Sequence, residues 1–302
     1  ARPYCHGQQA RTLHGRYGAL RFLMTLSTCI KTSLKDVLFR RLIKNAGILL
    51  TGNVAASILG LFSLALTARA LDVDVFGILV LITTYVAVID RLINFQSWQA
   101  LIKYGAEALA RSREDDFKSL LKFGFLLDFG TAIAGTLVAG SGAWLVGQWL
   151  DWSPDATMLA ALYSLTIIFH VAGAPTAILR LFDRFKLFSV ITVAAAVVKL
   201  LGVTLAFFAG AGLWAFLLIW AVTDIIGKIL LLGAALRELR INNCLHLRNA
   251  SVAEMSTRFP GIWGFVFTTN INASIRMSTR EADVLIVGAI LTPSAVGLYK
   301  IA

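Results

Sequence analysis

The chain has 302 residues, of which 58% are hydrophobic and 15% are charged, and its mean hydropathy is +0.76. This composition differs from that of a water-soluble globular domain, which is far less apolar. The net charge of +11 would suggest nucleic-acid binding in a soluble protein, but the basic residues gather between long apolar runs, which favours a membrane topology and argues against a nucleic-acid partner.

The chain begins with a basic segment, 1–44, that shows no core-forming pattern. We take Met24 as the natural start and exclude 1–23 from fold reasoning. The first apolar run is too long for the hydrophobic region of a signal peptide and lacks a clear cleavage site, so we expect it to remain as a membrane anchor. The three cysteines are too widely spaced to indicate a disulfide framework or a zinc site.

Apolar runs of the length needed to cross about 30 Å of hydrocarbon, roughly 20 residues, then follow one another. The sequence predicts an eighth membrane helix near Ser294, after helices at 45–68, 77–97, 121–147, 157–180, 187–209, 213–236 and 259–290. Pro175 should kink the helix at 157–180, because proline has no amide hydrogen and clashes with the preceding turn. We therefore predict an all-α polytopic membrane protein that contacts the lipid bilayer.

Lysine and arginine are distributed unequally between the links. The N-terminal segment and the links at 98–122, 180–186 and 237–258 contain 21 of the 28 basic residues, whereas the opposite links contain one, Arg69. Basic links remain in the cytoplasm of bacterial membrane proteins. The sequence therefore predicts a cytoplasmic N-terminus in the inner membrane.

The beginning of the apolar region is repeated near the end of the chain. Four of six residues are identical between 53–58 and 270–275, and Gly77 and Gly297 follow at similar distances. Six helices separate the equivalent points, so both units enter the membrane in the same direction. We therefore predict a parallel internal repeat of about 220 residues, of the kind that transporters use to build a central cavity.

This repeat divides the chain into segments. They are the basic cytoplasmic segment 1–44, a first six-helix lobe at 45–236, a cytoplasmic linker at 237–258 and the start of a second lobe at 259–302. A two-lobed molecule built from such repeats needs about twelve helices. We therefore expect the chain to be truncated within its second lobe.

Several stretches resemble a known transporter family. The stretches 52–57, 66–77 and 95–107 are similar to the first repeat of polysaccharide-export and O-antigen flippases, and 280–288 and 296–299 to the start of the second. These flippases belong to the multidrug/oligosaccharidyl-lipid/polysaccharide exporter superfamily. The resemblance implies a two-lobed fold of about twelve to fourteen helices around a cavity. It also implies alternating-access transport of an undecaprenyl-pyrophosphate-linked oligosaccharide for O-antigen and lipopolysaccharide assembly, together with other polysaccharide-assembly membrane proteins.

Charged residues predicted at membrane depth are the first candidates for a site. Arg276, Arg280 and Asp283 are spaced i, i+4 and i+7, which places them on one face of a helix. A charge at that depth costs about 2.5–3.5 kcal/mol, so it should face a water-filled cavity. Guanidinium groups match phosphate oxygens, so the two arginines are predicted to bind the pyrophosphate. The alternatives are an external loop or a self-neutralised cluster at 276–283.

Other charged residues are candidates for cavity lining or ion coupling. Asp90 and Arg91 either line the inner mouth of the cavity or form an ion pair at the cytoplasmic interface. Lys199 lies near the middle of its helix and is a further cavity candidate. An ion gradient, of protons or sodium, would be coupled through an intramembrane acid such as Asp283 or Asp90.

Four more polar residues have mainly structural interpretations. Asp224 and Lys228 are spaced i, i+4 and should neutralise each other. Asp128 is predicted to be a solvated acid near the start of its helix. His170 either relays protons or forms a hydrogen bond across a helix interface.

No phosphate-binding loop, zinc-protease motif, Cys-x-x-Cys pair or nucleophile elbow occurs in the sequence. These absences favour a transporter without a metal or cofactor over an enzyme. Two alternatives to the flippase stay open, namely an ion-coupled multidrug exporter of the same superfamily and a polytopic enzyme acting on polyprenyl-linked sugars. Such an enzyme generally needs a large hydrophilic outer loop, and the outer links here are short.

Overall fold

The computed structural model describes residues 37–95, 97–150, 152–242, 244, 250–253, 255–278 and 282–301. Within these ranges all regular secondary structure is helical. Six helical segments are long and apolar enough to cross a membrane. The protein is therefore an all-α polytopic membrane protein, as its composition predicts. By its internal contacts it divides into two units, Ala1–Ile48 and Leu49–Ala302, and the packing described below lies within the second.

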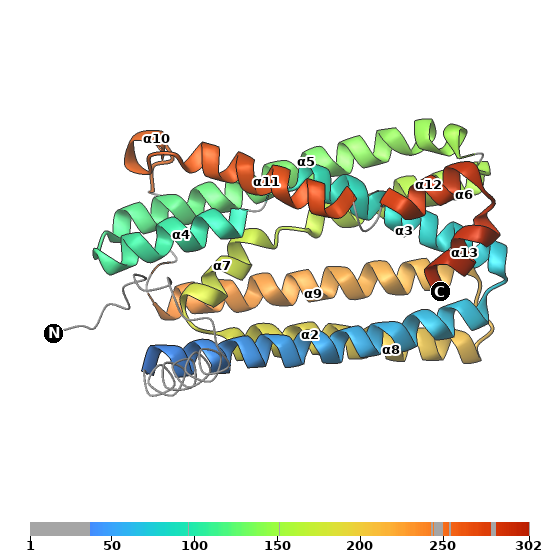
Figure 1. Cartoon of the computed structure of the whole chain (residues 1–302), viewed down its shortest axis with the longest axis horizontal. Coiled ribbons are helices and arrows are strands. Elements are labelled where there is room, and N and C mark those ends of the chain that lie inside the picture. The colour runs from blue at the N-terminus through green and yellow to red at the C-terminus, as the bar shows by residue number, and fades with distance from the viewer. Residues whose placement is uncertain are drawn as a thin grey trace, which may run out of the picture. The chain divides into compact units, whose positions relative to one another are not determined.

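Figure 1 shows the arrangement of the helices. In chain order they are α2 (Val37–Ala70), α3 (Val73–Ile93), α4 (Ser97–Ala110), α5 (Glu114–Trp149), α6 (Pro154–Tyr163), the 3-10 helix η1 (Ser164–Phe169), α7 (Gly173–Leu181), α8 (Phe185–Phe208), α9 (Leu213–Ile241), α10 (Met255–Arg258), α11 (Ile262–Ser278), α12 (Ala282–Ile290) and α13 (Pro293–Ile301). Local signals set two of the starts. Three acidic residues occupy the first turn of α5, where they favour the positive end of the helix dipole. Ser153 caps α6 by accepting a hydrogen bond from the Ala156 amide at 3.2 Å.

Helix α4 lies in the stretch 98–122, which the sequence analysis assigned to a link. The helix is amphipathic. It buries Ala100, Leu101, Tyr104 and Ala108, while its charged residues are exposed. Its buried face packs against α5 and α7. A search for long apolar runs misses such a helix, because only one side of it is apolar.

The fourth predicted helix, 157–180, is interrupted. It consists of α6, η1 and α7, and residues 170–172 between η1 and α7 are not helical. Pro175 lies in the first turn of α7, where its ring would clash with the carbonyl group of Val171 in a continuous helix. The kink predicted at Pro175 is thus a break just before it, and α7 is a separate short helix in Figure 1.

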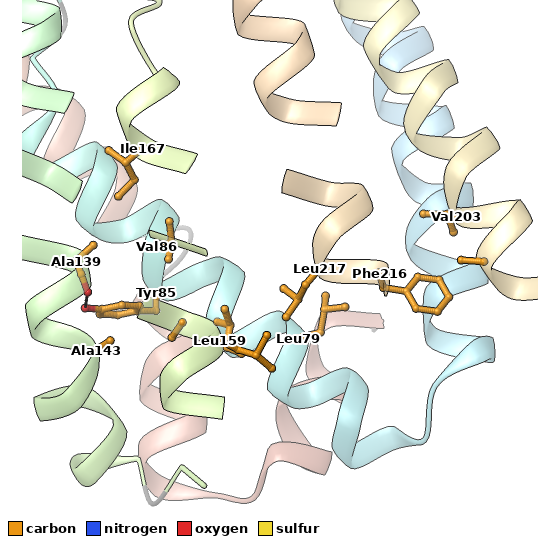
Figure 2. Packing of buried hydrophobic residues seen from close by; sticks show 13 residues of the cluster. Leu79, Tyr85, Val86, Ala139, Ala143, Leu159, Ile167, Val203, Phe216 and Leu217 are labelled. Atoms are coloured by element: carbon orange, nitrogen blue, oxygen red, sulfur yellow. Dashed lines mark hydrogen bonds between the residues drawn. The ribbon is translucent and has the colours of Figure 1, made fainter. Parts of the chain in front are cut away.

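The largest hydrophobic cluster around α3 and α5 depends on small residues in α5 (Figure 2). The Tyr85 hydroxyl of α3 donates a hydrogen bond to the Ala139 carbonyl at 2.6 Å. A Cβ atom at Gly135 would lie 3.1 Å from the Ile167 side chain, and one at Gly142 would lie 2.9 Å from the Tyr85 hydroxyl. Small residues let membrane helices approach closely. The small face of α5 therefore brings α3 and η1 close to it.

Helices α8 and α9 pack against each other and present apolar side chains outward. Leu205 and Phe208 of α8 and Leu218 of α9 are 72%, 80% and 64% exposed. A soluble protein rarely exposes so much contiguous apolar surface. Hydrocarbon is the solvent that suits these faces.

Helix α13 packs against the first two turns of α3 through two glycines. A Cβ atom at Gly77 would overlap the Pro293 carbonyl oxygen, and one at Gly297 would lie 3.0 Å from the Val73 carbonyl oxygen. Gly77 thus faces Pro293, four residues before Gly297, and Gly297 faces Val73, four residues before Gly77. The Ser294 hydroxyl also donates a hydrogen bond to the Asp74 carboxylate.

Candidate functional site

The break before α7 places a histidine between two transmembrane helices. His170 Nδ1 lies 2.9 Å from Asp90 Oδ2 of α3, and His170 Nε2 lies 2.6 Å from Asp224 Oδ2 of α9. The Asn94 side-chain amide donates a hydrogen bond to the His170 carbonyl at 3.2 Å. An unwound backbone carbonyl in a membrane needs such a partner. The His170 carbonyl is thus bonded by the residue that follows α3 and also by the Ala172 amide at 2.9 Å. Each of the two ring nitrogens of His170 faces a carboxylate.

A third carboxylate holds the start of α7. Asp128 is fully buried and accepts hydrogen bonds from the Ala174 amide at 2.6 Å and from the Ser97 hydroxyl. The carboxylate thus satisfies an amide that the first turn of a helix leaves without an intrahelical partner. The prediction of a solvated Asp128 is wrong, because α5 begins well before it, at Glu114, and directs this residue toward α4 and α7.

Gly173 is required by the same arrangement. A Cβ atom there would lie 2.7 Å from Asp128 Oδ1 and 2.9 Å from Oδ2, and it would also overlap the Ser97 hydroxyl. Real Cβ atoms do not approach other atoms so closely without a shift of the neighbours. The absence of a side chain at this position therefore lets the Asp128 carboxylate reach the helix start.

Basic residues of α7, α8 and α9 also lie in this region. Lys228 Nζ lies 3.9 Å from Asp224 Oδ1, which confirms the predicted i, i+4 pair. Lys199 Nζ lies 3.5 Å from the centroid of the Trp220 ring, a cation–π contact. The Arg180 guanidinium stacks over Trp98 at 4.4 Å. Its buried Nε atom has no hydrogen-bond partner within the described part of the chain.

A polar cavity of about 340 Å³ lies beside Asp90, His170, Arg180 and Lys228. It is bounded by the ends of α3 and α4, the helix break, α7, α8 and α9, and its lining consists of Asp90, Arg91, Asn94, Phe95, Trp98, His170, Ala172, Gly173, Thr176, Arg180, Phe188 and Lys228. Asp90 and Arg91 therefore line a cavity. Lys199 is not part of this lining; it faces Trp220.

The candidates at 276–283 are only partly described. Helix α11 ends at Ser278 and α12 begins at Ala282, so Arg280 lies outside the described residues, as does the side chain of Arg276. Asp283 accepts hydrogen bonds from the Tyr299 hydroxyl at 2.6 Å and the Val284 amide at 2.8 Å. The common face predicted for the three charged residues, and their role, remain predictions.

The contacts of His170 with Asp90 and Asp224, which lie 80 and 54 positions away, were not predicted from the sequence. One signal was present, namely a histidine and three acids within apolar runs, each of which needs a partner at membrane depth. No group of three or more His, Cys, Asp or Glu side chains suited to a metal ion occurs in the described ranges.

Comparison with known proteins places this site in a family. Residues 42–302 match the family model described as polysaccharide biosynthesis protein. The chain belongs to this family. It is also 32% identical over 276 residues to the inner membrane protein YghQ of Escherichia coli K12, an alignment that covers 90% of this chain and 77% of the relative. No solved structure matches the chain.

The family match covers the polar cavity and all the elements around it. It begins within α2 and extends to the end of the chain. The resemblance to polysaccharide-export proteins noted in the sequence is thus confirmed at the level of the family. The residues that line the cavity, together with Asp224, all lie within the matched range.

Proposed function

We propose that this protein moves an undecaprenyl-pyrophosphate-linked oligosaccharide across the bacterial inner membrane by alternating access. Membership of the polysaccharide biosynthesis family, similarity to a protein named as an inner membrane protein and six apolar segments of spanning length support this role. The lipid-linked sugar unit would be the transported substrate, and its transport requires no covalent change to it.

The observation that carries the proposal is the basic character of the polar cavity. Arg91 of α3, Arg180 of α7 and Lys228 of α9 all line it, against one carboxylate, Asp90. Charges are costly at membrane depth and are retained where they serve a ligand or a partner. Pyrophosphate is a multivalent anion, and guanidinium groups bind its oxygens through paired hydrogen bonds. We propose that Arg276 and Arg280 contribute to the same head-group site from the second lobe.

The predicted topology gives the cavity a direction. The basic links at 98–122 and 180–186 are proposed to be cytoplasmic, and the cavity lies beside the helix ends that lead into them, with Trp98 and Arg180 in its lining. A lipid-linked sugar unit that is assembled at the cytoplasmic face would therefore meet this cavity first. The amide of Asn270 in α11 donates to the Asn94 carbonyl at 3.3 Å, so the start of the proposed second lobe reaches the cavity edge.

Replacing Arg180 with glutamine tests the head-group site. Arg180→Gln keeps a side chain of similar length and removes the charge, so we expect loss of lipid-linked oligosaccharide flipping in proteoliposomes at a normal protein level. Arg111→Gln, on an exposed side chain at the end of α4, is the matched control and should transport normally. Transport by Arg180→Gln at the wild-type rate would remove this residue from the proposed site.

A multidrug exporter of the same superfamily is the alternative that shares the fold. The aromatic residues Trp98 and Phe188 in the cavity lining would suit a cationic drug, but three basic residues would repel it. Drug resistance conferred on an expressing strain, with unchanged surface polysaccharide, would favour this alternative over the flippase.

A further inference from the structure

His170, Asp90 and Asp224 form a cluster, and the contacts of His170 fix the number of protons that the cluster holds. An ionised carboxylate can only accept hydrogen bonds, and a neutral imidazole carries one N–H group. Both ring nitrogens of His170 lie within hydrogen-bond distance of carboxylate oxygens, at 2.9 Å from Asp90 and 2.6 Å from Asp224. Each contact needs a hydrogen atom between its two heavy atoms. The cluster therefore holds one proton more than a neutral histidine with two ionised aspartates.

This extra proton lies between three separate elements of the fold. Asp90 belongs to α3, His170 to the non-helical break, and Asp224 to α9. The His170 and Asp90 side chains are only 15% and 16% exposed, and Asp224 is 42% exposed. Asp90 and His170 line the polar cavity. The cluster thus has a polar route along which a proton can arrive and leave.

We propose that Asp90, His170 and Asp224 form a binding site for one coupling proton, which holds α3 and α9 together across the helix break. The proposal rests on the transport function proposed above and names the ion that drives it. A proton enters from the cavity, is shared by the imidazole and the two carboxylates, and leaves again as a proton. No electron or other group is transferred.

Loss of the proton weakens the link for an electrostatic reason. One ring nitrogen would then direct its lone pair at a carboxylate oxygen less than about 3 Å away, where a hydrogen bond is replaced by repulsion. Separation of α3 from α9 relieves that repulsion. The start of α7 does not depend on the proton, because Asp128 of α5 holds it by the Ala174 amide. The movement is thereby confined to the break.

Other charged groups near the cluster influence whether it holds or releases its proton. On α9, Lys228 pairs with Asp224. Lys199 of α8 and the Tyr163 hydroxyl at the end of α6 lie close enough to Asp224 to interact with it. From α3 and α7, Arg91 and Arg180 line the same cavity. Two lysines and two arginines thus lie near the two carboxylates, an environment that allows the cluster to release its proton.

A sodium ion does not fit these contacts. Hard cations bind to oxygen ligands, whereas here the two carboxylates face the nitrogen atoms of one imidazole ring. The described ranges contain no group of side chains suited to a metal ion at this place. The proton is therefore the ion that this geometry favours.

A measurement without substrate tests the link itself. Spin labels at Leu92 of α3 and Ile241 of α9, both exposed, would be introduced into the reconstituted protein after removal of the native cysteines. We expect the interlabel distance to increase as the pH rises, with a one-proton transition. His170→Gln should abolish that transition, and so should Asp224→Asn, whose amide can either donate to or accept from His170 at any pH. Asp115→Asn, on an exposed residue in the first turn of α5, should keep it.

Two outcomes would overturn the proton site. One is a wild-type distance that does not change with pH, or that changes with sodium at constant pH. The other is an unaltered pH transition in both His170→Gln and Asp224→Asn, with each variant eluting as a folded protein in size-exclusion chromatography.

A transport assay separates this proposal from the proposed function. In proteoliposomes, a pH gradient should accelerate flipping by the wild type and by Asp115→Asn but not by His170→Gln. A wild type that shows the pH-dependent distance but carries no such lipid would refute the proposed function and leave the proton site intact. Gradient-driven flipping by His170→Gln would refute the proton site and leave the function intact.

Discussion

At the scale of single residues, the features that shape the site are buried polar atoms and the glycine that admits them. Asp128 connects α5 to the start of α7, and Asn94 of α3 binds the carbonyl of His170. Within a membrane these bonds replace those that water would supply. Gly173 is the position where this network has no room for a side chain.

Gly173→Ala should therefore destabilise the protein. The added methyl group would overlap Asp128 and Ser97, and overpacking of this kind typically costs about 1–3 kcal/mol. Thermal unfolding in detergent would measure the change. Gly140→Ala is the matched control, because a Cβ atom there meets nothing within 4 Å. Equal stability of both variants would show that the neighbours of Gly173 can move aside freely.

At the scale of helices, close packing depends on small residues that let one helix approach another, as α5 does for α3. The segment Val73–Ala110, which contains α3, is the most buried of the membrane candidates, and Tyr85 of α3 packs against α5. The Tyr85 side chain is 2% exposed, so its hydroxyl group has to find a partner inside the protein. The Ala139 carbonyl supplies it.

Tyr85→Phe should lower the free energy of unfolding by about 0.6–1.7 kcal/mol, the range measured for hydrogen bonds between membrane helices. Tyr104→Phe is the comparison, since its hydroxyl makes a longer bond of 3.3 Å to the Pro260 carbonyl and its loss should matter less. Unfolding of the reconstituted protein by denaturant would rank the two. A larger effect at Tyr104 would contradict the importance given to the bond between α3 and α5.

At the scale of the whole molecule, the contact between α3 and α13 joins positions that the proposed internal repeat treats as equivalent. Asp74 binds Ser294, 220 positions later. Gly77 contacts the residue four positions before Gly297, and Gly297 contacts the residue four positions before Gly77. A contact in which each partner repeats the role of the other is the geometry of a two-fold axis. Such a contact is what a two-fold relation between these positions would produce, and the parallel repeat itself stays a prediction.

Cysteines at positions 74 and 294 test the contact. After removal of the native cysteines, Asp74→Cys combined with Ser294→Cys should form a disulfide on mild oxidation in the membrane, because the two side chains touch. Asp72→Cys combined with Ser294→Cys is the control and should cross-link poorly. Mobility in gel electrophoresis would report the bond. Failure of the first pair to cross-link in any buffer would place α13 away from α3.

The sequence alone determined the class of the protein and much of its helical plan. Hydrophobic runs of spanning length located α2, α5, α8 and α9 within a few residues of their centres, because the cost of exposing backbone in hydrocarbon leaves a helix as the solution for each run. The Asp224–Lys228 pair was also predictable, since residues four apart on a helix are neighbours.

Only the tertiary structure decided which polar groups meet. Helix α4 escaped prediction because its apolar residues cover a single face, and Asp128 was misjudged because the start of α5 lies further back than its apolar run. The proton cluster brings together three separate segments, through His170, Asp90 and Asp224. Hydropathy predicts the membrane depth of each residue but not which residue it contacts. Partners at a given depth are set by how the helices pack, and that packing depends on side-chain shape along whole helix faces. The proton-binding arrangement is therefore a property of the fold.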